Sequence, residues 1–145
     1  MGRDATTDEP LPHVDEHEVV LPVPIEAAWS AVHRSVARSF LLRDGHPLAG
    51  ILGAEPRQGF EVVSESSPTR LELAGRHRFS RYRLTFVLVA TSPRSTTVRA
   101  ITDAAFPGLH GSVYRTLVIG TGAHARIVRG ILERMRDDVV DHPTP

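Results

Sequence analysis

A curved antiparallel sheet wrapped around a long C-terminal helix is the α+β fold that this sequence predicts. Runs of alternating apolar and polar residues, separated by short turn sequences, fill the middle of the chain. One helical stripe of apolar residues precedes these runs and a longer stripe follows them. At 145 residues the chain suits one domain with a single core. We expect that domain at 13–138, after a disordered lead at 1–12 and before a tail at 139–145.

The first expected strand covers 14–21, and the first helix begins at Pro24, a residue suited to the first helical turn. An apolar stripe at steps of three or four follows. Its members are Ile25, Trp29, Val32, Val36 and Phe40. The stripe fits one long helix or two short helices with a bend near Ser35, and the Asp44-Gly45 turn ends it.

A meander of antiparallel strands is predicted next, at 59–66, 70–75, 81–91 and 96–106, with a further short strand at 48–54. The turn sequences are Ser66-Ser67-Pro68-Thr69 and Ser92-Pro93-Arg94-Ser95. Alternation places one set of side chains on the inner face of the sheet. That set is Leu71, Leu73, Tyr82, Leu84, Phe86, Leu88, Val98, Ala100, Thr102, Ala104 and Phe106.

The terminal helix is predicted from Ser112, which can cap it, to Asp138. Its apolar side carries Val113, Leu117, Gly120, His124, Val128, Ile131 and Met135. Its polar side carries Arg115, Arg126, Arg129, Glu133 and Arg136. Gly120 and Gly122 are unusual inside a helix, where they either open room for a ligand or allow close packing.

Composition excludes several classes of function. The 17 basic and 17 acidic residues cancel, so no overall field attracts nucleic acid or an anionic membrane. The lack of cysteine excludes disulfides and thiolate chemistry. No apolar run approaches the roughly 20 residues of a membrane span. We therefore expect a cytoplasmic monomer or homodimer that has no cofactor and no metal and does not bind nucleic acid.

Three segments resemble the START-like, or SRPBCC, superfamily, which includes birch-pollen-allergen-like, polyketide cyclase/dehydrase-like and lipid-transfer proteins. They are Leu21-Pro22-Val23-Pro24-Ile25-Glu26-Ala27-Ala28-Trp29, the run from Leu73 to Tyr82, and the run from Phe106 to Tyr114. The resemblance extends over about residues 14 to 137. It implies a helix-grip fold with a cavity between the sheet and the terminal helix, in which relatives often hold an apolar ligand. Because one fold hosts many activities, the resemblance does not identify a reaction.

The hypothesis favoured by the sequence is non-catalytic binding of a small hydrophobic or aromatic molecule. His77, Tyr82 and His124 would orient its polar end. The expected ligand-binding residues are Trp29, Phe60, Leu73, His77, Tyr82, Phe86, Ala100, Leu117, Gly120, His124 and Val128. His124 also fits a structural role, as a core histidine bonded to a backbone carbonyl or a buried hydroxyl.

Two alternatives stay open. A polyketide cyclase/dehydrase-like enzyme would use His124 or His77 as general acid or base, assisted by Tyr82. A protein-interaction module would instead have its cavity filled by aromatic side chains. Two further patterns are weaker: the arginines of 76–83 fit a solvated strand face better than a nucleic-acid stripe, and His13 with His17 lacks a third zinc ligand.

Overall fold

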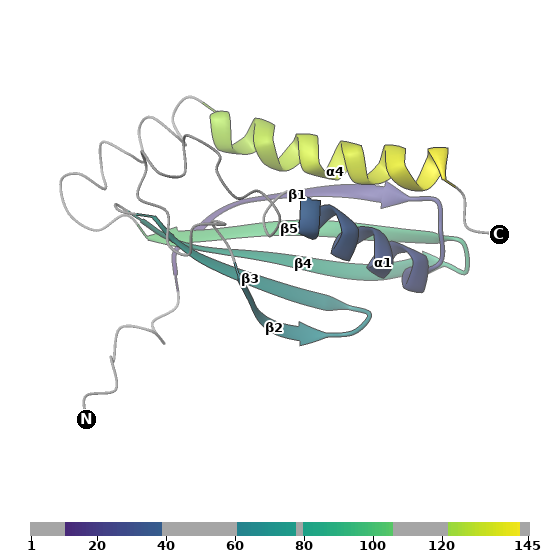
Figure 1. The fold of residues 1–145 in the computed structure, drawn as a ribbon, viewed down its shortest axis with the longest axis horizontal. Helices are drawn as coiled ribbons and strands as arrows, with labels where there is room; N and C mark the ends of the chain where they lie inside the picture. The colour runs from purple at the N-terminus through teal and green to yellow at the C-terminus, as the bar shows by residue number, and fades with distance from the viewer. Residues whose placement is uncertain (1–10, 39–60, 78–79, 106–121, 143–145) are drawn as a thin grey trace.

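The computed structural model describes residues 11–38, 61–77, 80–105 and 122–142 (Figure 1). The elements are β1 (His13–Leu21), α1 (Ile25–Val36), β2 (Glu61–Ser66), β3 (Arg70–His77), β4 (Ser80–Ser92), β5 (Ser95–Ala105) and α4 (Ala123–Asp141). The expected strand at 48–54 and the residues Phe60, Phe79 and Phe106 lie outside the described residues.

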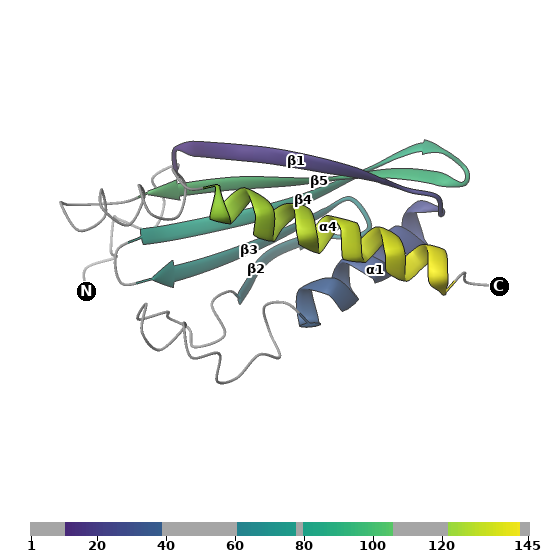
Figure 2. The ribbon, with the colours of Figure 1, turned by 90° about the horizontal axis from the view of Figure 1, so that it is seen from above.

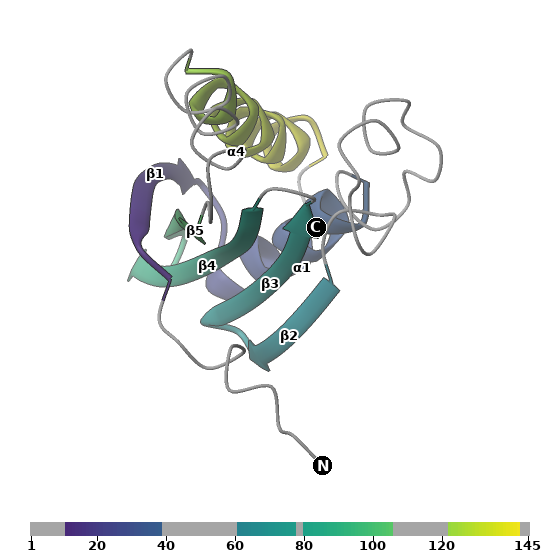
Figure 3. The same cartoon turned by 90° about the vertical axis from the view of Figure 1, so that its left-hand side faces the viewer.

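The five described strands form one antiparallel sheet in the order β1-β5-β4-β3-β2. Seen from its end, the sheet curves beneath α4 (Figure 3). The β2–β5 meander was predicted correctly, including its turns at 67–69 and 93–94. β1 closes the other edge by pairing with β5, from His13 opposite Asp103 to Leu21 opposite Thr96.

The predicted inner face of the sheet is confirmed by burial. On β3 and β4, Leu71, Leu73, Tyr82, Leu84, Phe86 and Leu88 are all buried; on β5, Val98, Ala100, Thr102 and Ala104 are buried as well. β3 and β4 meet at the pair His77 and Ser80, so the chain reverses between these two residues. Gly75, two residues before His77, lies directly opposite Tyr82, two residues after Ser80.

Helix α1 begins one residue later than expected, because Pro24 has an extended backbone with φ −59° and ψ 158°. Its carbonyl oxygen accepts the first helical hydrogen bond, from Ala28 N at 3.0 Å. The helix passes Ser35 without a break, and any second helix lies outside the described residues. The buried residues of α1 are Ala28, Ala31, Val32 and Val36, with Ile25 and Trp29 partly buried against the same core.

Helix α4 differs from the prediction at its start. Gly122 has a left-handed backbone, with φ 73° and ψ 8°, which an α-helix does not contain. A continuous helix through Gly122 was therefore a wrong prediction, and residues 112–121 lie outside the described part of the chain. At its other end the helix continues beyond Asp138 to Asp141 and buries Val139.

The core lies between the inner face of the sheet and the two helices. The buried side of α4 carries Val128, Ile131, Leu132, Met135 and Val139. Figures 1 and 2 show α4 running along β1, with its C-terminal end near α1, and these two elements are its main contacts. The expected polar side, Arg126, Arg129, Glu133 and Arg136, is exposed. Among the described residues, neither helix has the length and apolar character that a membrane crossing requires.

Candidate functional site

The inner face of the sheet changes character from one end to the other. Near α1 its cross-strand pairs are large or branched, such as Val98 opposite Leu88. Toward the end where β1 begins and β5 finishes, small and polar side chains replace them on β1 and β5, while β4 still carries Phe86 and Leu84 in the same rows. We call this region the polar end of the inner face; it comprises Asp15, His17, Tyr82, Ala100, Thr102 and Ala104.

Cross-strand register joins these residues into three neighbouring rows. Asp15 lies opposite Thr102, and Ala104 lies opposite Tyr82. In the third row Ala100 lies between His17 and Phe86. The rows share a face of the sheet because directly opposed residues in an antiparallel pair point the same way. Thr102 and Tyr82 are buried, with exposed fractions of 1% and 5%.

Asp15 and His17 form the central polar contact of this region. The Asp15 Oδ2 and His17 Nε2 atoms are 3.1 Å apart, and the two side chains are 26% and 15% exposed. From α4, Arg129 Nε reaches His17 Nδ1 at 3.5 Å. Since Arg129 can only donate, Nδ1 is the acceptor, and Nε2 then carries the proton given to Asp15. Both ring nitrogens of His17 are therefore engaged.

The sequence pattern alone does not single out the Asp15–His17 pair as part of a site. In the sequence, His17 stands out only through its spacing from His13, which predicts no zinc site without a third ligand. The structure gives the two histidines different carboxylate partners, since His13 Nδ1 lies 3.4 Å from Asp103 Oδ1. The available signal was the two-residue alternation: Val19 faces inward, so residues 17 and 15 share its side.

Several of the predicted ligand-binding residues are brought together in the hydrophobic core. Leu73, Phe86, Ala100 and Val128 belong to one buried cluster. Their close packing gives them an evident structural role. The placement of Phe60, Leu117 and Gly120 lies outside the described residues.

The predicted trio of His77, Tyr82 and His124 is described only in part. Tyr82 lies on the inner face in the polar end. His77 is the last residue of β3, and His124 lies in the first turn of α4, four residues before the buried Val128. The side chains of both histidines lie outside the described part of the structure, so their meeting with Tyr82 stays a prediction.

Trp29 packs against the core from α1 and also connects that helix with the edge of the sheet. Its ring meets the His33 ring edge-on, with centroids 4.9 Å apart and planes at 67°. His33 Nε2 in turn lies 2.9 Å from Glu65 Oε1 on β2. Trp29 therefore contacts both the core and His33, and His33 in turn joins α1 to β2.

No protein-family model and no curated protein matches this sequence. Solved structures do resemble it. A START superfamily protein from Mycobacterium smegmatis is 13% identical, with 88% of this chain and 99% of that chain covered and a TM-score of 0.53. The Zhui aromatase/cyclase from Streptomyces sp. R1128 is 10% identical, with 89% and 96% covered and a TM-score of 0.55.

CalU16 from Micromonospora echinospora is 14% identical, with 90% of this chain and 76% of that chain covered and a TM-score of 0.56. Identities this low establish a common architecture and leave the activity to be argued from the site. The curved five-stranded sheet, the helix after β1 and the terminal helix packed against the sheet agree with that architecture. The chain therefore has the START-like, helix-grip fold that its sequence resemblance predicts.

Proposed function

We propose that this protein binds a small, mostly apolar molecule between the polar end of the inner face and α4. The observation that carries the proposal is the clustering of the buried Thr102 and Tyr82 and the partly buried Asp15 and His17 beside the small alanines of β5. Binding sites for small molecules typically combine an apolar lining with a few convergent polar groups. The polar end has this composition.

The small residues of β5 support a site at this position. Ala104 on β5 lies directly opposite Tyr82 on β4. On its other side, Tyr82 lies opposite Gly75 on β3. A row of alanine, tyrosine and glycine carries less side-chain volume than the row of Val19, Val98 and Leu88. Interiors pack at high density, so the space beside small side chains is filled either by other protein groups or by a bound molecule. The proposal assigns part of that space to the ligand.

The polar contacts support an orienting role for this region. Asp15 and Arg129 contact the two nitrogens of the His17 ring and fix its orientation. The Asp15–His17 pair thus provides a fixed polar surface toward which the ligand's polar group can be oriented. A catalytic role for His124 or His77 has no support of this kind and stays a separate prediction.

A fluorescence titration with N-phenyl-1-naphthylamine, an uncharged aromatic probe, tests the proposal. We expect saturable binding to the wild-type protein. Ala104→Phe places a ring in the space proposed for the probe and is expected to weaken binding roughly tenfold, or about 1.4 kcal/mol. Ile101→Phe is the matched control, because Ile101 lies on the opposite face of the same strand.

Thermal unfolding shows whether each variant is folded, and Ala104→Val is a milder change if the phenylalanine variant does not fold. The proposal fails if the wild-type protein shows no saturable signal. It also fails if both phenylalanine variants, when folded, bind the probe as tightly as the wild type.

A further inference from the structure

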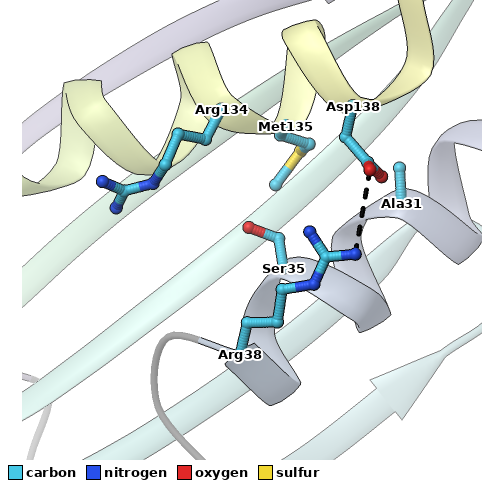
Figure 4. A pocket seen from close by; sticks show the side chains of 6 residues that line it. All are labelled: Ala31, Ser35, Arg38, Arg134, Met135 and Asp138. Atoms are coloured by element: carbon cyan, nitrogen blue, oxygen red, sulfur yellow. Dashed lines mark ion pairs between the residues drawn. The ribbon is translucent and has the colours of Figure 1, made fainter. Parts of the chain in front are cut away.

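A small pocket lies between α1 and α4, on the side of the molecule away from the polar end of the inner face (Figure 4). Its volume is about 60 Å³. Its lining residues are Ala31, Ser35, Arg38, Arg134, Met135 and Asp138. A water molecule takes about 30 Å³ of liquid, so this α1–α4 pocket suits an ion of a few atoms. It is too small for the apolar ligand proposed above.

The single carboxylate of the pocket already has a partner in a neighbouring arginine. Arg34 donates from Nε and Nη2 to Asp138 Oδ2, at 3.3 and 3.2 Å. Arg38 approaches the other oxygen of Asp138 only to 3.8 Å, and its side chain is 65% exposed. Arg34 therefore satisfies much of the charge of Asp138, and Arg38 is free to turn toward another anion.

The remaining polar groups of the pocket have no partner in the part of the chain that the structure describes. Neither the Arg134 guanidinium nor the Ser35 hydroxyl forms a hydrogen bond or ion pair with a described residue. Figure 4 shows the Ser35 hydroxyl on the stretch of α1 that lies between the Arg134 and Arg38 side chains. Arg34 and Arg38 approach the Asp138 carboxylate, whereas the Arg134 side chain extends in the other direction along α4, toward Gly130. The lining of the pocket thus holds two arginines and one carboxylate, and that carboxylate also pairs with Arg34.

We propose that the α1–α4 pocket binds a phosphate-type oxyanion. Arg38 and Arg134 would donate to its oxygens from two sides, and Ser35 would donate from the helix between them. An anion with several oxygens suits donors that arrive from different directions. The apolar wall of Ala31 and Met135 excludes water from one side and strengthens these charged hydrogen bonds.

The pocket is independent of the proposed apolar-ligand site. Arg129, which contacts His17 at the polar end, precedes the nearest lining residue of α4, Arg134, by five residues, or about 7.5 Å along the helix axis. The failure of one site would therefore leave the other untouched.

Titration of the ¹⁵N-labelled protein with inorganic phosphate, at an ionic strength held constant with sodium chloride, tests this site. We expect saturable shifts in the NMR resonances of the Arg38 and Arg134 side chains. Arg38→Gln and Arg134→Gln should each weaken phosphate binding roughly tenfold, since each removes a charged donor. Arg136→Gln is the matched control: Arg136 is exposed on the same helix and does not line the pocket.

Asp138→Asn should change phosphate affinity in the opposite direction, since it removes the carboxylate that competes with phosphate for Arg38. Phosphate should bind this variant more tightly than the wild type. A parallel titration with methyl phosphate distinguishes the source of the anion: tighter binding assigns the pocket to a phosphoryl group on a larger molecule, and equal binding assigns it to the free ion. The proposal is overturned if wild-type shifts do not saturate, or if Arg136→Gln weakens binding as much as the pocket variants do.

Discussion

Arg34 of α1 and Asp138 of α4 are joined by two hydrogen bonds, although they lie 104 residues apart in the sequence. The Nε and Nη2 atoms of Arg34 both donate to the same carboxylate oxygen, Oδ2 of Asp138. Arg38 and His142 each approach the other oxygen of Asp138 at 3.8 Å. The Asp138 side chain is only 17% exposed, so this carboxylate fixes the C-terminal half of α4 against α1.

A double-mutant cycle measures this contact. Arg34→Gln and Asp138→Asn should show a coupling of about 0.5–1 kcal/mol in the free energy of unfolding, because the Arg34 side chain is about half exposed. Asp138→Asn alone should cost more than Arg34→Gln, since it also loses Arg38 and His142. Urea denaturation of the four proteins gives the values. Strictly additive effects would show that the two side chains do not interact.

Two glycines of α4 should respond to alanine with opposite signs. Gly122→Ala is expected to destabilise by about 1–2 kcal/mol, because its φ of 73° is unfavourable for a side chain. No atom lies within 4 Å of the added Cβ, so the cost comes from the backbone alone. Gly130→Ala should stabilise by about 0.5–1 kcal/mol, since Gly130 is inside the helix and only the flexible end of Arg134 lies near.

Thermal or urea unfolding of both variants distinguishes the two backbone states. If Gly122→Ala stabilised the protein as Gly130→Ala does, then α4 would extend through residue 122. That result would restore the longer helix that periodicity predicts.

Burial on the inner face predicts a contrast between two valines. Val98→Ala, at a fully buried position on β5, should cost about 2 kcal/mol or more. Val89→Ala, at a position 56% exposed on β4, should change stability by less than about 0.5 kcal/mol. The same chemical change is thus compared on the two faces of adjacent strands. Similar costs in urea denaturation would contradict the assignment of faces.

The ring contact of Trp29 can be observed directly, because it is the only tryptophan of the chain. His33→Ala removes the edge-on contact and the ion pair with Glu65, so the Trp29 emission should shift and stability should fall by about 1 kcal/mol. Glu65→Gln keeps the ring contact, and we expect a much smaller spectral change. An unchanged spectrum in His33→Ala would mean that the two rings do not meet in solution.

Strand periodicity predicted the sheet well because burial on one face imposes a strict two-residue alternation. The inward positions of β3, β4 and β5 follow from this rule alone. The same rule, extended back from Val19, would have placed His17 and Asp15 inside. Charged and polar side chains at these two positions carry no apolar signal for the inner face, and the spacing of His13 and His17 instead resembles that of metal ligands.

Helix boundaries and polar contacts were harder to predict. The helical spacing of the predicted stripe continues from Val113 to His124. It therefore gives no sign of the left-handed Gly122, which directly precedes α4. The predicted stripe of α1 runs through large side chains and includes the buried Val32, but it omits Ala28 and Ala31, which are also buried and allow close approach to the core. The Arg34–Asp138 contact depends on the packing of two distant helices, which no local pattern encodes.

The most direct test of the binding proposal locates the bound molecule. Intermolecular nuclear Overhauser effects between N-phenyl-1-naphthylamine and the methyl groups of the protein report contacts within a few ångströms. We predict contacts to Ala100, Thr102 and Ala104 on the inner face. Contacts confined instead to the exposed valines Val20 and Val89 would place the probe outside the sheet and contradict the proposed site.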